Sequence, residues 1–289
     1  MKRKNCGYFL LALVILVLFS RDTPARQTEK SLLWKIEGKA IKTSYLFGTF
    51  HMLPKSDFEI KEKVRDAFNL CEQLVLELKM DNPLMQLELL NYVAMKDSMT
   101  IDQLVDSADY LRLDQALRES VGIGIAMFNS YKPMLIGALL IMKYIEGEPA
   151  SFDLTLTEMA KERGIPIAGL ETVKYQVSIF DEIPYEDQIK DVMKMINEEE
   201  RMTEMFSEMV STYRNEDLNA LFDLTRQDAV SEKEIELMLL KRNRDWIPKI
   251  EILSKDKPTF YGVGAAHLGG EEGLIFLLRK AGYKVSPVL

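Results

Sequence analysis

The chain has 289 residues, of which 47% are hydrophobic, and its 45 acidic and 37 basic residues give a net charge of −8. This length supports one substantial hydrophobic core or at most two modest domains. The acidic balance, with no basic stripe, argues against nucleic acid as a partner.

Residues 1–25 have the composition of a secretory signal peptide. Lys2, Arg3 and Lys4 precede an apolar run from Tyr8 to Phe19, and small residues follow as far as Ala25. Such a run is shorter than the roughly 20 residues that span a bilayer. We therefore expect an exported protein, periplasmic or secreted. The alternative is an uncleaved N-terminal anchor, which would be the one membrane-bound part of the chain.

The domain that follows, residues 26–289, is expected to begin with a β-hairpin over residues 31–50, with its turn at Glu37 and Gly38. Apolar residues at helical spacing then predict a helix that ends near Cys71, and "QLVLEL" (73–78) is a short buried strand. Cys71 is the one cysteine after the signal peptide, so no internal disulfide is possible, and we expect it to be a buried small hydrophobe.

Two long helical stretches, at about 83–150 and 185–249, interrupt the strands and are interpreted as insertions. Between them, residues 153–163 predict a short amphipathic helix that Gly164 terminates. The following "IPIAGLE" is a strand that ends at Glu171.

The C-terminal region repeats the strand–loop–helix order. "PTFYGVG" predicts a strand, "AAHLGG" a loop, "EEGLIFLLRK" a helix and "YKVSPV" a last strand. Strands that alternate with helices are typical of an α/β fold. The prediction is a single domain with a mixed central sheet, flanking helices and the two helical insertions.

Both histidines of the chain occur in the same sequence frame. "YLFGTFH" ends at His51 and "YGVGAAH" ends at His267, so each histidine follows a glycine by three residues and a tyrosine by six. A glycine at that position lets the chain turn sharply off a strand end, or bring its backbone close to a ligand. A lone histidine is most often structural, but the shared frame favours one functional site for the pair.

Four side chains are expected at or just beyond the carboxyl ends of strands: His51, Glu77, Glu171 and His267. Ligands bind at that edge of open α/β sheets. Two imidazoles with carboxylates suit a divalent metal ion such as zinc, manganese or cobalt. The sequence alone leaves open that the histidines only brace the strand ends.

A second candidate is "KRNRDW", which places Arg242, Asn243 and Arg244 near the end of a helical region. Arginine binds carboxylates through two parallel hydrogen bonds. Taken alone, the pattern favours a helix with surface ion pairs, which contribute little. Asp153 and Tyr261 are weaker candidates for the site.

These motifs resemble the TraB/GumN family, which includes the TIKI-type metalloproteases. The resemblance rests on "YLFGTFHML", "LVLEL", "GIPIAGLETVKYQ", "KRNRDW" and "GVGAAHLGGEEGLIFLLRKAGYKVSPV", and it covers the chain from about Ser31 to its end. It implies a single α/β domain with a mixed sheet and a metal-dependent hydrolase site. One departure is Ala265-Ala266, where a glycine often precedes the histidine.

Carried over by motif, the resemblance makes His51 and His267 the paired G-x-x-H histidines and Glu77 the acidic residue of the second strand. Glu171 matches the family's G-L-E, and the R-N-R stretch makes Arg242, Asn243 and Arg244 site residues. The predicted metal ligands are His51, His267 and Glu77, although Glu171 could replace Glu77. The remaining carboxylate would then act as general base, and Arg242 or Arg244 would hold a substrate carboxylate or an oxyanion.

Two functions follow from this site. The first is a metal-dependent hydrolase that acts on peptides or another small substrate, with manganese, cobalt or zinc as its ion. The second is a non-catalytic protein that binds a peptide or a small signal at the same residues.

Overall fold

A computed structural model describes residues 30–289, apart from 39, 229 and 230. The predicted signal peptide, residues 1–25, lies outside the described residues. Among the residues that are described, no helix has the length and apolarity needed to cross a membrane.

A six-stranded mixed sheet forms the centre of the fold, with the order β6-β4-β7-β2-β1-β8. The strands are β1 (Leu33–Glu37), β2 (Ser44–Thr49), β4 (Gln73–Leu76), β6 (Ile167–Gly169), β7 (Thr259–Gly264) and β8 (Lys284–Pro287). The four strands from β6 to β2 are parallel, whereas β1 is antiparallel to both β2 and β8. A separate pair joins β3 (Leu53–Pro54) to β5 (Pro149–Ala150). The predicted α/β fold with a mixed sheet is therefore confirmed.

The expected hairpin is the β1–β2 pair, in which Leu33 lies opposite Phe47. Its inward-facing side chains join the main core, where Trp34, Phe260 and Tyr261 are completely buried. Each such side chain contributes on the order of 1.5–3 kcal/mol through the apolar surface that it removes from water.

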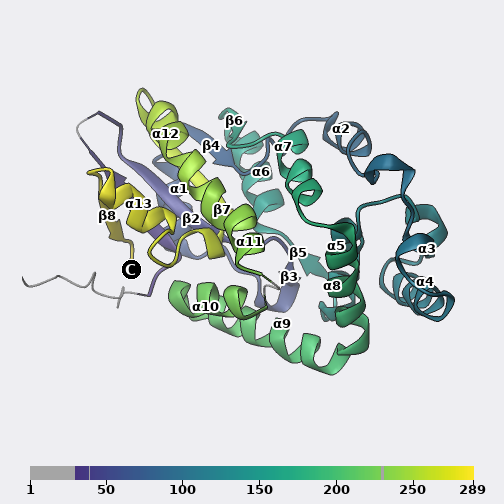
Figure 1. Cartoon of the computed structure of the whole chain (residues 1–289). Helices are drawn as coiled ribbons and strands as arrows, with labels where there is room; N and C mark the ends of the chain where they lie inside the picture. Colours follow the sequence, from purple (N-terminus) through teal and green to yellow (C-terminus); the bar gives the residue numbers. More distant parts are fainter. Residues whose placement is uncertain (1–29, 39, 229–230) are drawn as a thin grey trace, which may run out of the picture.

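Thirteen α-helices lie in the described part of the chain, and Figure 1 shows α12 and α13 in front of the sheet. They are α1 (Glu62–Asn69), α2 (Met85–Leu90), α3 (Ile101–Leu104), α4 (Ser107–Val121), α5 (Pro133–Leu140), α6 (Phe152–Arg163), α7 (Val173–Ser178), α8 (Tyr185–Asn197), α9 (Glu199–Arg214), α10 (Leu218–Asp228), α11 (Glu232–Ile235), α12 (Lys241–Ser254) and α13 (Leu274–Lys280).

A second core forms where the two helical stretches meet. Leu117 of α4, Ile136 of α5 and Val192 of α8 pack together there, away from the sheet. Figure 1 shows α3, α4, α5 and α8 at the end of the molecule opposite β8. The second stretch then divides: α8 belongs to this helical end, whereas α12 packs beside α13 and contributes Trp246 to the main core.

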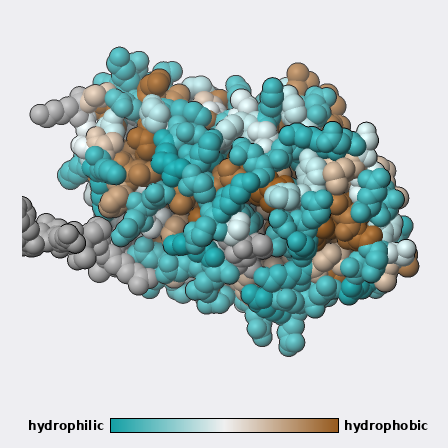
Figure 2. All heavy atoms as spheres, in the orientation of Figure 1, coloured by the Kyte–Doolittle hydropathy of each residue, from teal (hydrophilic) through white to brown (hydrophobic). Residues whose placement is uncertain are grey.

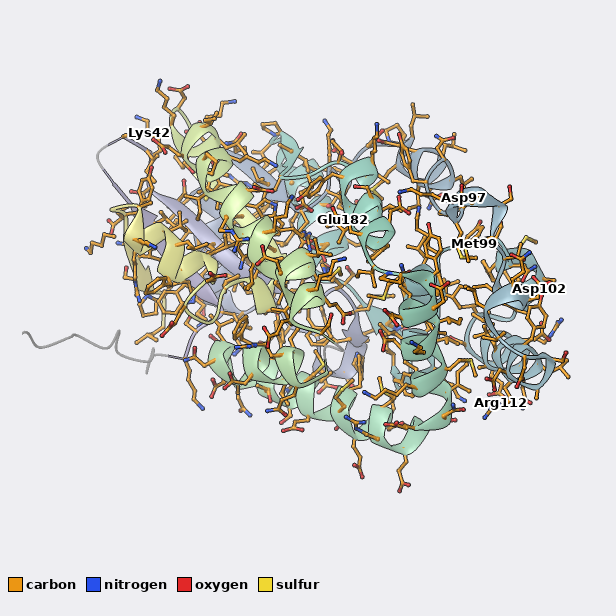
Figure 3. All side chains as sticks on the ribbon, viewed as in Figure 1. Lys42, Asp97, Met99, Asp102, Arg112 and Glu182 are labelled. Atoms are coloured by element: carbon orange, nitrogen blue, oxygen red, sulfur yellow. The ribbon has the colours of Figure 1, made fainter. Side chains whose placement is uncertain are left out.

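The surface of the molecule is mainly hydrophilic, with small hydrophobic areas between polar side chains on the face that Figure 2 shows. At the helical end, the labelled Asp97, Asp102 and Arg112 project outward in Figure 3. Arg112 bonds to Asn197 and to Asp109. These three labelled charged residues of the helical end are exposed to solvent.

Helix α6 shows how the local sequence positions a site residue. The Ser151 hydroxyl accepts from the backbone N–H of Leu154 and caps the helix, and Gly164 ends it with φ 65°. The cap places Asp153 in the first turn, where the helix dipole favours a negative charge.

Glu216 joins the first strand to the helices that cover it. Its buried carboxylate accepts from the backbone N–H of Leu32 at 2.9 Å, from Lys61 at 2.6 Å and from Lys63 at 2.7 Å. Burial alone raises the pKa of Glu216, but these three donors outweigh burial and hold the pKa below its usual value.

We expect Glu216→Gln to lower the free energy of unfolding by about 1–3 kcal/mol at pH 7, because the variant keeps the shape but loses the charged acceptor. A depressed pKa stabilises the fold above the unfolded pKa of about 4.3, and this contribution is lost as the pH falls. The difference from the parent should therefore shrink at pH 3.5. Urea unfolding at both pH values measures it, with the exposed Glu62→Gln as control. An equal difference at both pH values would contradict this account.

Candidate functional site

The carboxyl ends of the four parallel strands meet at one edge of the sheet. In the strand registers, Thr49 lies beside Gly264, and Leu76 lies beside both Gly262 and Gly169. The residues predicted to follow these ends are brought together there: His51, Glu77, Glu171 and His267. Helix α12 adds Arg242 and Asn243 to the same cluster.

Arg242 lies at the centre of the cluster, and its side chain is 5% exposed. Its Nε donates to Glu171, and Nη2 donates to Glu77 Oε2 at 2.6 Å and to Glu171 Oε2 at 2.8 Å. Nη1 donates to the carbonyl of Met238 and to Nε2 of His267. All five N–H groups of the guanidinium are engaged within the protein, so none is directed at a ligand.

The carbonyl of Met238 belongs to a π-helical turn, Glu236–Leu240, that directly precedes α12. Short π-helical segments are frequent at functional sites, because they reposition the next part of a helix. Here the turn brings a backbone acceptor to the Arg242 guanidinium.

Glu171 faces the interior and serves to hold Arg242. Its side chain is fully buried, and its two oxygens accept from Arg242 and from the indole N–H of Trp246 at 2.9 Å. The guanidinium also lies over the Trp246 ring, 4.9 Å from its centre.

Glu77 presents its two oxygens in different directions. Oε2 accepts from Arg242 and from Gln176 at 3.1 Å, whereas Oε1 accepts from the backbone N–H of Gly264 at 2.8 Å and faces the histidines. Burial alone raises the pKa of Glu77, but the charge of Arg242, the two histidines and the Gly264 N–H hold it well below its usual value. Glu77 is therefore ionised at neutral pH.

His267 is buried and neutral. Burial lowers its pKa to about 3; Arg242 and His51 lower it as well, while the charge of Glu77 opposes them. Asn243 Nδ2 donates to the carbonyl of Glu272, so Asn243 Oδ1 must accept from His267 Nδ1 at 2.6 Å. The proton therefore lies on Nδ1, so Nε2 is the acceptor for Arg242 Nη1 at 3.2 Å, and Glu77 Oε1 lies 3.7 Å from the same Nε2.

His51 has a comparable arrangement on the open side of the site. Its Nδ1 bonds to Asp153 Oδ2 at 3.0 Å, and its Nε2 is 4.0 Å from Glu77 Oε1. The removal of water by neighbouring atoms lowers the pKa of His51, but Asp153 and Glu77 outweigh that effect and raise it to about 9. Its side chain is 66% exposed, so solvent screens these charges.

Gly264 forms one wall of the space between these groups. A methyl group at this position would lie 3.3 Å from Glu77 Oε1 and 3.6 Å from atoms of both His51 and His267. The absence of a side chain therefore leaves a space that the two imidazoles and one carboxylate oxygen face. This is a local reason for the glycine three residues before His267.

The donor chemistry of this space suits a borderline divalent ion, because it combines two imidazole Nε2 atoms with one carboxylate oxygen. An Asp153 carboxylate behind one imidazole, and an amide oxygen behind the other, are typical supports of metal-binding histidines. The separations of 3.7 and 4.0 Å exceed the roughly 3.4 Å between ligands of a tetrahedral ion with bonds near 2.1 Å. Accordingly, no three His, Cys, Asp or Glu residues of the described chain are grouped closely enough to hold a metal ion.

Arg244 lies apart from the cluster. Its side chain is 42% exposed and pairs with Glu236 and Glu272 on the surface. Two residues along a helix are separated by about 200° of rotation, so Arg242 and Arg244 point to nearly opposite sides.

Sequence reasoning left out three contributors: Gln176, Trp246 and, except as a weak candidate, Asp153. Gln176 donates to both Glu77 and Glu171, and Trp246 donates to Glu171. One available signal was the spacing of Arg242, Trp246 and Ile250, which recur every four residues and so share a helix face.

The fold and the clustered side chains define an α/β protein with a buried polar site at the carboxyl edge of its parallel strands. The chain belongs to the TraB/PrgY/gumN family, whose model matches residues 32–287. A protein named metalloprotease TIKI homolog, from Amphimedon queenslandica, is 22% identical over an alignment of 343 positions that includes 96% of this chain and 67% of that protein. No solved structure gives a significant match. The family resemblance inferred from the motifs is thus confirmed.

We expect Arg242→Met to lower the free energy of unfolding by about 3–5 kcal/mol at pH 7, because Glu77 and Glu171 would remain buried without their partner. Arg244→Met is the matched control and should cost about 0–1 kcal/mol, because its pairs are on the surface.

The pH dependence separates lost charge pairing from lost packing. The depressed pKa of Glu77 means that its pairing stabilises the parent at neutral pH and is lost as the pH falls. The Arg242→Met penalty should therefore be smaller at pH 4 than at pH 7. Urea unfolding at the two pH values is the measurement, and a penalty that stays constant would attribute the loss to packing alone.

Proposed function

We propose that this protein is a metal-dependent hydrolase that cleaves peptide substrates. The observation that carries the proposal is the convergence of His51 Nε2, His267 Nε2 and Glu77 Oε1 around the space beside Gly264. Family membership and the name of the Amphimedon queenslandica relative support the same function.

In this proposal, His51, His267 and Glu77 would hold the ion, with the two imidazole–carboxylate separations shortened from 4.0 and 3.7 Å. The hydrogen bonds of Asp153 and Asn243 keep a proton on Nδ1 of each imidazole and leave Nε2 as the ligand atom, and on His267 the ion would replace the hydrogen bond from Arg242 Nη1. His51 must lose its second proton before it can bind an ion, since its pKa is about 9. Manganese, cobalt and zinc are the candidate ions, as the sequence indicated.

A bound divalent ion would supply a Lewis acid and lower the pKa of a bound water, so a strongly basic side chain would not be required. The protein's own contribution is preorganisation. Arg242 fixes Glu77 and keeps it ionised, while Glu171 and Trp246 fix Arg242. With both oxygens of Glu171 engaged inside the protein, Glu77 is the carboxylate that we assign to the ion.

Export is part of the proposal and rests on the sequence pattern of residues 1–25. The proposed site requires neither a nucleotide nor a reducing environment, so it is compatible with activity outside the cytoplasm. Substrate binding would involve the exposed side of the site, where His51 is accessible.

Metal binding to the purified protein tests the central step. We expect one manganese, cobalt or zinc ion per chain in the parent, and at least a tenfold loss of affinity in His51→Ala and in His267→Ala, because each removes one of three ligands. Isothermal titration with each metal chloride measures this, with the surface variant Arg244→Met as control. Equal affinity of both histidine variants and the parent would exclude these residues as ligands.

Gly264→Ala gives an independent variant that keeps every proposed ligand. Its φ is negative, so alanine is compatible with the backbone, and the added methyl occupies the space between Glu77 Oε1 and the imidazoles. It should weaken metal binding with little change in unfolding. Gly137→Ala in α5, where the methyl would make ordinary contacts, is the matched control.

Turnover distinguishes the hydrolase from the alternative, a protein that binds peptides without cleaving them. We expect a peptide library to be cleaved by the metal-loaded parent, and neither by the chelated protein nor by His267→Ala. Mass spectrometry of the library identifies the products. Stoichiometric retention of intact peptide, without metal-dependent cleavage, would contradict the hydrolase and support the binding protein.

A further inference from the structure

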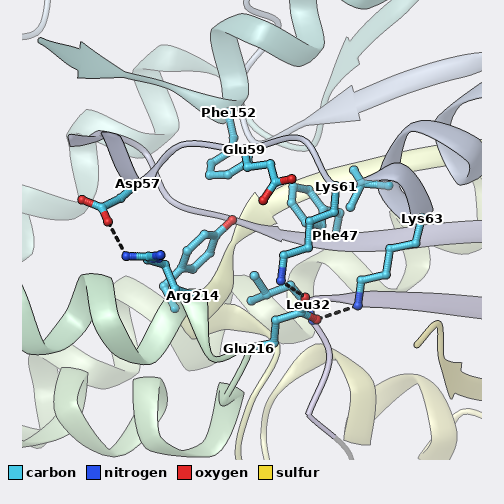
Figure 4. Close-up of a pocket in the computed structure, with 11 residues that line it drawn as sticks. Leu32, Phe47, Asp57, Glu59, Lys61, Lys63, Phe152, Arg214 and Glu216 are labelled. Carbon is cyan, nitrogen blue, oxygen red and sulfur yellow. Dashed lines mark hydrogen bonds and ion pairs between the residues drawn. The ribbon is translucent and has the colours of Figure 1, made fainter. Parts of the chain in front are cut away.

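A pocket of about 170 Å³ lies outside the histidine cluster, between β2, the N-terminal end of α1, the start of α6 and the junction of α9 with α10 (Figure 4). Three buried aromatic rings, those of Phe47, Phe152 and Tyr213, form much of its wall. The centre of the Phe152 ring is 5.5 Å from the centre of the Phe47 ring and 5.5 Å from that of the Tyr213 ring. The volume of this pocket is comparable with that of an engineered apolar cavity of about 150 Å³ that holds benzene.

Charged side chains of both signs surround this aromatic wall. Lys61, Arg214, Asp57 and Glu59 are the exposed or half-buried members, and Figure 4 shows them around the aromatic side chains. Lys63 and Glu216 are engaged in the fold: Lys63 donates to Glu216, to Ser31 and to the carbonyl of Val288. They are therefore excluded from ligand recognition.

Cationic groups at the pocket retain donors for a ligand. Lys61 donates to Glu216 at 2.6 Å and is 42% exposed, which leaves two of its three N–H groups. Arg214 pairs with Asp57 through Nη1 at 2.7 Å and is 61% exposed, so most of its guanidinium donors remain. Both groups suit a carboxylate.

Glu59 supplies the opposite charge. It is exposed, and it makes no hydrogen bond or ion pair with any residue that the structure describes. Figure 4 shows its carboxylate between the Phe152 ring and Lys61. An ammonium group bound there would gain a charge partner without displacing one that the protein already uses.

We propose that this pocket binds an aromatic α-amino acid in its zwitterionic form. The ring packs against Phe47, Phe152 and Tyr213, the ammonium group pairs with Glu59, and the carboxylate accepts from Lys61 and Arg214. A neutral aromatic compound would leave both charged groups unused, and a ligand with a single charge would leave one of them unused. The pocket does not share a side chain with the proposed metal site, so this proposal is independent of hydrolase activity.

Isothermal titration of the metal-free protein with L-phenylalanine tests the proposal. We expect saturable binding of one molecule per chain, with 3-phenylpropionate and phenethylamine at least about fivefold weaker, because each lacks one of the two charges that surface ion pairs can recognise. Equal binding of all three compounds, or no saturation by L-phenylalanine at millimolar concentrations, would overturn it.

Two substitutions locate the charged contacts. Glu59→Gln should weaken L-phenylalanine about fivefold and leave 3-phenylpropionate unchanged, because only the amino acid carries the ammonium group. Arg214→Gln should weaken the binding of L-phenylalanine and of 3-phenylpropionate, which both carry a carboxylate, and leave the binding of phenethylamine unchanged. Glu62→Gln, an exposed charge three residues beyond Glu59 that does not line the pocket, is the matched control. If Glu59→Gln and Glu62→Gln have the same effect on binding, Glu59 does not contact the ligand and the proposal fails.

Discussion

The arrangement of the site depends on one buried ion-pair network, in which Arg242 joins Glu77 and Glu171. The three side chains are 5%, 7% and 0% exposed, so their charges have almost no solvent to stabilise them. Desolvation of such groups is costly unless every donor and acceptor is matched. Here all five guanidinium N–H groups are matched, and the cost is offset by contacts that also fix the geometry of the strand ends.

This network gives the two carboxylates different environments. Glu171 accepts from Arg242 and Trp246 and is closed off from solvent. Glu77 shares Arg242 through one oxygen and turns the other toward the histidines. The same electrostatics keep Glu77 ionised and His267 neutral, which is the protonation state that a metal-binding pair requires. The geometry therefore distinguishes two carboxylates that the sequence left interchangeable: Glu171 holds Arg242, and Glu77 faces the histidines.

Much of the cluster could be predicted, because strand ends follow a simple rule. Parallel strands present their carboxyl ends at one edge, so His51, Glu77, Glu171 and His267 were expected together once each was placed after a strand. That rule could not predict the roles of Arg242 and Arg244. Arg242 and Arg244 have the same chemistry and nearly the same position in sequence, and only the orientation of α12 on the sheet directs Arg242 inward and Arg244 to solvent.

Asp153 and Gln176 are two further site residues that local sequence patterns do not identify. The chain has 45 acidic residues, and nothing local distinguishes the one that supports an imidazole from those that pair with surface lysines. Asp153 supports His51 because the Ser151 cap starts α6 beside the end of β2, a contact that spans about a hundred residues of sequence.

The sequence by itself determined the fold class, the strand ends and the four side chains that follow them, because alternation of strands and helices and the glycine-containing frames are local patterns. The tertiary structure decided which carboxylate faces the histidines, which arginine holds both carboxylates, and where a second, aromatic pocket forms. Those outcomes depend on how helices far apart in sequence pack onto the sheet, and packing against distant partners is not encoded in any short stretch of the chain.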